Sequence, residues 1–117
     1  MAIPAKNKIR GVRAFAAIFR TVRPTSSAHL SIRAQRSNPS SAMRYSVTVP
    51  VKVAPTAVLR SGARRRVSEA IRRIMQQRTV RPDVAAVFSV KQLPLPSGKT
   101  LEHELLILME KSGILSR

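Results

Sequence analysis

The sequence predicts a two-layer α/β (α+β) sandwich, a single small domain in which about four strands form one sheet and three helices pack on it. The chain has 117 residues, of which 44% are hydrophobic, and this is enough for one modest core. Apolar residues alternate with polar ones in some segments and recur at helical spacing in others. We expect a basic arm over residues 1–10 and one folded domain over residues 11–117.

The first predicted helix covers Gly11–Val22, between an arm that Pro4 keeps irregular and a stop at Pro24. Its apolar face consists of Val12, Phe15, Phe19 and Val22. A strand follows over Ala28–Ala34, with Leu30, Ile32 and Ala34 on one face, and then a loop over Arg36–Ala42.

The clearest strand is predicted over Met43–Lys52, where Pro50 indicates an edge or a bulge. One face of it carries Met43, Tyr45, Val47, Val49 and Val51, and the other carries Arg44, Ser46, Thr48 and Lys52. Whether a further short strand follows it stays open at this point.

A long helix is predicted over Ala57–Gln77, with Thr56 as its N-cap. Gly62 near its start costs up to about 1 kcal/mol of helix stability relative to alanine. The apolar stripe of this helix is Ala63, Val67, Ala70, Ile71 and Ile74, and the opposite side carries Arg60, Arg64, Arg65, Ser68 and Arg72.

The C-terminal part is predicted to form a strand over Val84–Lys91, a loop over Gln92–Lys99 and a last helix capped by Thr100. Glu102 and Glu104 are expected in the first turn of that helix, where the helix dipole favours negative charge. Its buried stripe is Leu101, Leu105, Leu108 and Met109.

The net charge of +17, from 22 Lys and Arg against 5 Asp and Glu, indicates a polyanionic partner. Fourteen of the 22 basic residues precede Glu69, the first acid. Nucleic acid is the commonest polyanion, and an anionic membrane surface is the alternative, although no apolar run reaches the ~20 residues of a spanning helix. The chain has no cysteine, which excludes disulfides and fits a reducing compartment such as the cytoplasm.

A self-contained hydrolytic site is not indicated. Glu69 lies four residues from both Arg65 and Arg73, which favours local ion pairing, and His29 and His103 stand apart from any metal-binding spacing. We therefore expect no catalytic residue and no metal site on the protein, and a nuclease acting alone is the least favoured class.

The helix over Ala57–Gln77 carries the densest group of positive charges, with four arginines between Arg60 and Arg66. Guanidinium groups bind phosphate through paired hydrogen bonds. A solvated helix face is the alternative, but such faces ordinarily mix both signs, and here Glu69 is the single acid. We therefore expect this helix to bind phosphate.

The segment Ala57-Val58-Leu59-Arg60-Ser61-Gly62-Ala63-Arg64-Arg65-Arg66-Val67-Ser68-Glu69 resembles the signature of the bacterial ribonuclease P protein family. Upstream, Phe15 and Phe19 match its paired phenylalanines, and Val47–Lys52 matches its lysine-containing turn, so the resemblance runs from end to end. Three positions depart from the pattern and mark a divergent member: Ser61 stands for asparagine, Gly62 where a basic residue is common, and Ser68 for the last arginine.

The resemblance implies a left-handed crossover between strands through the arginine-rich helix, and two RNA surfaces. One surface docks on the catalytic RNA through Lys52, Arg60, Ser61, Gly62, Arg64 and Arg65, with Arg72 added on charge alone. The other is a cleft between the first helix and the sheet that receives the 5′ leader of precursor tRNA. It includes Phe15 and Phe19 and, if that strand face lines it, Arg44, Ser46 and Thr48. From spacing alone, core packing of the two phenylalanines stays the simpler alternative to base stacking.

The function implied by the resemblance is assistance to a catalytic RNA that removes the leader from precursor tRNA. The catalytic RNA and precursor tRNA are the expected partners, with no membrane and no obligate protein partner, and Mg²⁺ is expected through the RNA. A small ribosomal or other structural RNA-binding protein is the alternative. It explains charge and size, but not the signature frame with two upstream phenylalanines.

Overall fold

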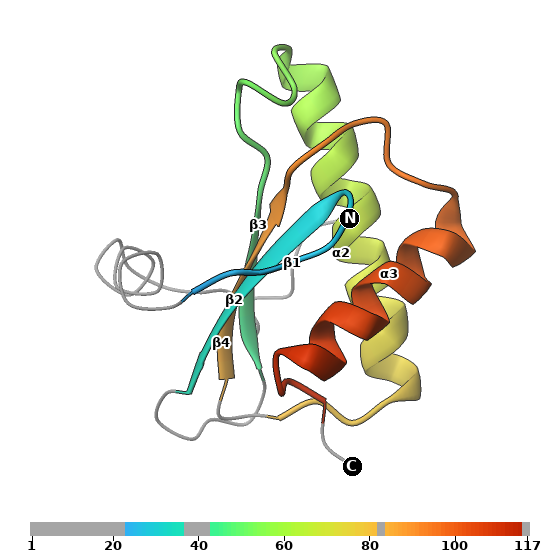
Figure 1. Ribbon diagram of the computed structural model, residues 1–117. Helices are drawn as coiled ribbons and strands as arrows, with labels where there is room; N and C mark the ends of the chain where they lie inside the picture. Colours follow the sequence, from blue (N-terminus) through green and yellow to red (C-terminus); the bar gives the residue numbers. More distant parts are fainter. Residues whose placement is uncertain (1–22, 37–42, 82–83, 116–117) are drawn as a thin grey trace.

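The computed structural model of the protein describes residues 23–36, 43–81 and 84–115 (Figure 1). In chain order these residues form β1 (Thr25–Ser26), β2 (Leu30–Arg36), β3 (Arg44–Thr48), α2 (Ala57–Gln77), β4 (Val84–Val90) and α3 (Gly98–Lys111). The predicted arm over residues 1–10 and the predicted helix Gly11–Val22, with Phe15 and Phe19, lie outside the described residues.

The four strands form one sheet in the order β1-β2-β4-β3. β2 pairs with β4 in antiparallel fashion over all seven residues, whereas β3 lies parallel to β4. Parallel neighbours need a crossover connection, and α2 supplies it. Both α2 and α3 cover the same face of the sheet (Figure 1), so the described residues form the predicted two layers.

The core lies between the sheet and the two helices. Tyr45 of the edge strand β3 and Phe88 of the neighbouring strand β4 lie in this core, with ring centroids 6.0 Å apart in an edge-to-face arrangement. Apolar side chains from both helices complete it, among them Val67, Ile71, Leu101 and Leu105, all at most 1% exposed. With so few aromatic residues, aliphatic packing carries most of the burial, as the composition predicted.

The predicted strand Met43–Lys52 is wrong at its C-terminal end, because β3 stops at Thr48. Pro50 has no N–H to pair with a neighbouring strand. The chain instead turns there, and the N–H groups of Val53 and Ala54 both donate to the Pro50 carbonyl at 3.0 Å. Lys52 therefore lies in a turn and not in a strand. Val51, which was predicted on the same strand face as Tyr45, lies in this turn too, and its side chain is 65% exposed.

The first predicted strand is shifted. β2 covers Leu30–Arg36 and not Ala28–Ala34, because Ser27 donates its N–H to the Leu30 carbonyl at 2.8 Å and closes a tight turn just before it. The short strand β1 precedes this turn and therefore lies before β2. The further short strand that was left open after the predicted strand Met43–Lys52 is not formed, because α2 is the next element after β3 in the described residues. At the far end, β4 stops at Val90, and the Lys91 N–H donates to the His29 carbonyl.

The bounds of α2 are those predicted, and Thr56 caps it by accepting a hydrogen bond from the Leu59 N–H at 3.2 Å. One assignment on this helix is wrong: Ser68 does not face outward but is 8% exposed. A serine is small enough to lie at the margin of the apolar stripe.

The start of α3 is also corrected. The N-cap of the helix is Ser97, three residues before the predicted cap Thr100, and the helix begins at Gly98. As a result, Glu102 and Glu104 lie beyond the first turn, which contains no acid. Each of them instead has a specific partner in another element: Arg73 of α2 for Glu102, and the β1–β2 turn for Glu104.

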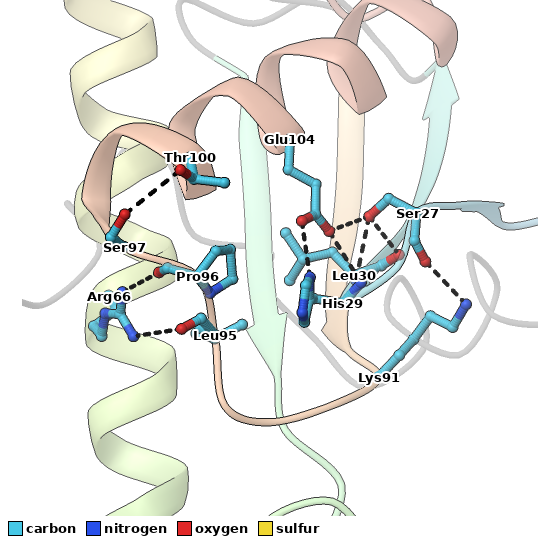
Figure 2. Close-up of polar contacts among 10 residues, drawn as sticks. All are labelled: Ser27, His29, Leu30, Arg66, Lys91, Leu95, Pro96, Ser97, Thr100 and Glu104. Carbon is cyan, nitrogen blue, oxygen red and sulfur yellow. Dashed lines mark hydrogen bonds and ion pairs between the residues drawn. The ribbon is translucent and has the colours of Figure 1, made fainter.

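Glu104 fastens α3 to the β1–β2 turn (Figure 2). Its carboxylate accepts a short hydrogen bond from the Ser27 hydroxyl, a second from the His29 N–H at 3.0 Å, and lies 3.0 Å from His29 Nδ1. Partial burial raises the pKa of Glu104, but the hydrogen bonds from Ser27 and His29 outweigh it and hold the pKa below its ordinary value of 4.5.

The Glu104 contacts predict an acid-dependent loss of stability. A carboxyl whose pKa is lowered by folding stabilises the protein above its ordinary pKa, and this contribution is lost as pH falls through the folded pKa. We expect Glu104→Gln to lower the free energy of unfolding by about 1–3 kcal/mol at pH 6, measured by urea unfolding. The gap to the wild type should shrink as pH falls below about 4.5.

Glu110→Gln is the matched control, because Glu110 is an exposed acid on the same helix. It should change the stability by less than about 0.5 kcal/mol at any pH. A gap between wild type and Glu104→Gln that did not change with pH would contradict the role given to this carboxylate.

Candidate nucleic-acid interface

The direction of each arginine on α2 follows from the stripe that this helix buries. Ala63, Val67, Ala70, Ile71 and Ile74 pack into the core. With 3.6 residues per turn, Ser61, Arg65 and Arg72 then align on the outward side, and Arg64 lies beside them on the flank away from α3. All four of these side chains are exposed. The structure therefore brings four of the predicted RNA-binding residues onto one helical surface, which we call the arginine face.

Arg72 lies close enough to β3 to influence it. Burial raises the pKa of Tyr45 above 10.0, and the positive charge of Arg72 opposes part of this rise. The arginine face thus extends from the start of α2 towards the edge strand β3.

Arg60 and Lys52 lie at the N-terminal end of the arginine face. The Arg60 guanidinium Nη1 donates to the carbonyls of Ala54 at 2.9 Å and Pro55 at 3.2 Å. Five N–H donors are present on a guanidinium, so these bonds leave others for a phosphate. Arg60 therefore also fixes the connection between the turn that contains the exposed Lys52 and the helix.

A second group of arginines, Arg66 and Arg73, lies on the flank of α2 that faces α3. For this group the sequence predicted only the local ion pair of Arg73 with Glu69. Arg66 donates to the carbonyls of Leu95, at 3.5 Å, and Pro96 (Figure 2). Arg73 donates to Glu102 at 2.9 Å and lies 4.0 Å from Glu69. Carbonyl partners some 30 residues away leave no pattern in the sequence, so the role of Arg66 could not be predicted.

The predicted leader-binding residues of β3 lie on the other face of the sheet. They alternate with Tyr45 and Val47, which point into the core, so Arg44, Ser46 and Thr48 point away from both helices. Their neighbours on β4 are Ala85, Val87 and Ser89, and the Thr48 and Ser89 hydroxyls lie 2.8 Å apart. The two predicted RNA surfaces are therefore separate, one on the helical layer and one on the face of the sheet that points away from α2 and α3.

Among residues 23–36, 43–81 and 84–115, no three His, Asp or Glu side chains lie close enough together to hold a metal ion. Nor is any helix within these ranges both long and apolar enough to cross a membrane. What the arrangement offers is fixed positive charge for binding a polyanion.

Comparisons with known proteins identify the family of this chain. The sequence model of the Ribonuclease P family matches residues 3–113. The chain belongs to the ribonuclease P protein family. No curated protein sequence matches it.

Solved ribonuclease P proteins share the fold. The protein from Thermotoga maritima superposes with a TM-score of 0.75 at 18% identity, over 89% of this chain and 96% of that chain. The protein from Staphylococcus aureus gives a TM-score of 0.73 at 14% identity, over 94% and 98%. Family membership makes the chain a ribonuclease P protein, a component of a tRNA-processing ribonucleoprotein whose partner is the ribonuclease P RNA. Family membership therefore favours this assignment over the alternative of a small ribosomal protein.

The two flanks of α2 predict different effects for neighbouring arginines. Arg66→Met should lower the free energy of unfolding by about 1–2 kcal/mol, because the carbonyls of Leu95 and Pro96 lose their charged donor. Arg65→Met removes the same charge from an exposed side chain and should change it by less than about 0.5 kcal/mol. Denaturant unfolding of both variants is the measurement, and equal effects would contradict the division of the helix into two flanks.

Proposed function

We propose that the arginine face of α2 docks on the catalytic RNA of ribonuclease P while the face of the sheet that points away from α2 and α3 holds the 5′ leader of precursor tRNA. The observation that carries this proposal is the exposed row of Ser61, Arg64, Arg65 and Arg72 on a helix whose opposite side is locked into the core. Phosphate binding by such a row needs no rearrangement of the fold, so little conformational entropy is lost on docking.

The division of labour between protein and RNA is part of the proposal. The resemblance to the family implies that Mg²⁺ is held by the RNA and not by side chains of the protein. A metal-bound water at the RNA would supply the nucleophile for hydrolysis of the phosphodiester bond that joins the leader to the tRNA. The protein raises the affinity of the RNA for its substrate, and precursor tRNA is its second partner.

The leader surface combines polar and aromatic groups. Arg44 supplies positive charge for the leader backbone, and Ser46 and Thr48 supply hydroxyls on the same strand face. Phe15 and Phe19, outside the described residues, match the aromatic positions of the family, and stacking on a ring contributes about 1–3 kcal/mol per base.

Three expectations from the resemblance also remain predictions. They are the left-handedness of the β3-α2-β4 crossover, a third helix over Gly11–Val22, and a cytoplasmic location. The parallel pairing of β3 and β4 supports the crossover itself.

The arginine face predicts a change in the salt dependence of RNA binding. Each phosphate contact contributes about 0.7–0.9 to the slope of log K against log salt. Arg64→Ala with Arg65→Ala should therefore weaken binding to the catalytic RNA and reduce the slope by about 1.4–1.8. Filter binding or fluorescence anisotropy over a salt series is the measurement.

Lys99→Ala with Lys111→Ala is the matched control, because it removes two exposed positive charges from α3. It should leave the slope nearly unchanged. If both double variants reduced the slope equally, net charge and not the arginine face would determine binding.

The leader surface predicts a selective effect of the aromatic residues. Phe15→Leu with Phe19→Leu keeps the apolar character but removes the rings. Affinity for precursor tRNA with a leader should fall by about 5- to 100-fold, the equivalent of one lost stacked base, while affinity for mature tRNA does not change. Equal losses for both substrates, or none for either, would show that the rings do not bind the leader.

A further inference from the structure

A groove of about 470 Å³ lies between the first turns of α2 and the loop that joins β4 to α3. From α2 it is lined by Val58, Leu59 and Gly62, and from the loop by Leu93 and Pro94. Its volume falls within the roughly 300–1,000 Å³ of sites that hold small molecules. The leader surface is on the other side of the sheet, so the groove is a separate feature.

The rim of the groove exposes apolar surface on a highly charged protein. Val58 is 81% exposed and Leu59 is 50% exposed. Both belong to the first turn of a helix that is otherwise apolar only where it packs into the core. Exposed apolar surface next to a hollow is typical of a binding site.

Gly62 gives a second, independent indication. A glycine inside a helix destabilises it relative to alanine. Nothing in the fold requires one here, because a Cβ built on Gly62 would meet no atom within 4 Å, and among the described glycines only Gly113 has a positive φ. The glycine therefore leaves the groove open at a cost in stability, and the benefit must come from what enters the groove.

The charge of the lining limits the occupant. Its only charged residue is Arg66, and no acid lines it. Because Arg66 donates to the carbonyls of Leu95 and Pro96 (Figure 2), its guanidinium is held as one wall. A guanidinium plane and aliphatic side chains are surfaces on which a flat ring can stack.

The groove is continuous with the arginine face. Gly62 follows Ser61 directly and precedes Arg65 by less than one helical turn, so a phosphate bound at Arg65 brings its own nucleotide to the groove. We propose that the groove receives one unpaired nucleobase of the RNA partner, held between the aliphatic rim and Arg66. This inference rests on the proposed docking of α2 on RNA, and it adds a contact to a base where the arginine face contacts phosphates.

Filling the groove tests the proposal. Gly62→Leu places a side chain in it, and Gly98→Leu is the matched control, since a Cβ at Gly98 also meets no atom within 4 Å. Circular dichroism and thermal unfolding should show both variants folded. At fixed salt, Gly62→Leu should lower affinity for the catalytic RNA by about 5- to 100-fold, as for one lost stacked base, with an unchanged salt slope.

The outcomes separate the two proposals. If wild-type protein does not bind the RNA at all, the docking of α2 fails. If wild type and Gly62→Leu bind equally well, docking stands and the base site is wrong, and the groove then serves a different occupant such as a protein or an apolar small molecule. If Gly62→Leu flattens the salt slope, the substitution has disturbed phosphate contacts and the base site is also rejected.

A titration of the wild-type protein avoids any effect of mutation on folding. Adenosine 5′-monophosphate should shift the methyl NMR signals of Val58, Leu59 and Leu93, and ribose 5-phosphate, which has no base, should not. Unmoved methyl signals with the nucleotide, or equal shifts with both compounds, would overturn the proposal.

Discussion

The docking of one apolar stripe of α2 on the sheet determines the direction of every arginine on that helix. Val67 and Ile71 are completely buried against the core, so the helix cannot roll without exposing them. This constraint places the arginines of α2 on two flanks with different roles. Arg64, Arg65 and Arg72 are exposed on one flank. On the other, Arg66 binds the loop between β4 and α3, and Arg73 binds α3. A positive charge of +17 repels itself in a compact chain, and an RNA partner neutralises that repulsion.

The sheet separates the two proposed RNA surfaces on this small domain. β4 lies between β2 and β3 and pairs with both, so the sheet is a continuous wall. One of its faces is covered by the helices, and the other carries Arg44, Ser46 and Thr48. Glu104 adds rigidity by tying α3 to the turn before β2, far from either RNA surface in the chain. The fold thus holds the positive surface of α2 and the polar face of β3 at a fixed position relative to each other.

Much of this arrangement could be predicted from the sequence because it depends on local periodicity. The bounds of α2, its cap at Thr56 and its buried stripe follow from helical spacing, and the faces of β3 follow from alternation. The failures come from contacts between distant segments. Alternation suggested that β3 extends to Lys52, but Pro50 closes a turn there. The partners of Glu104 and Arg66 lie 75 and 30 residues away, and no local pattern encodes them. The groove beside Gly62 could not be predicted either, because its other wall comes from Leu93 and Pro94, about 30 residues away.

The central claim is that the protein presents charge to RNA while the RNA cuts. It is tested most directly by cleavage of a precursor tRNA at low magnesium, with a bacterial ribonuclease P RNA alone, with this protein alone and with both. The account predicts slow cleavage by the RNA alone, faster cleavage when the protein is added, and none by the protein without RNA. Cleavage by the protein alone, or a rate with RNA that the protein leaves unchanged, would contradict it.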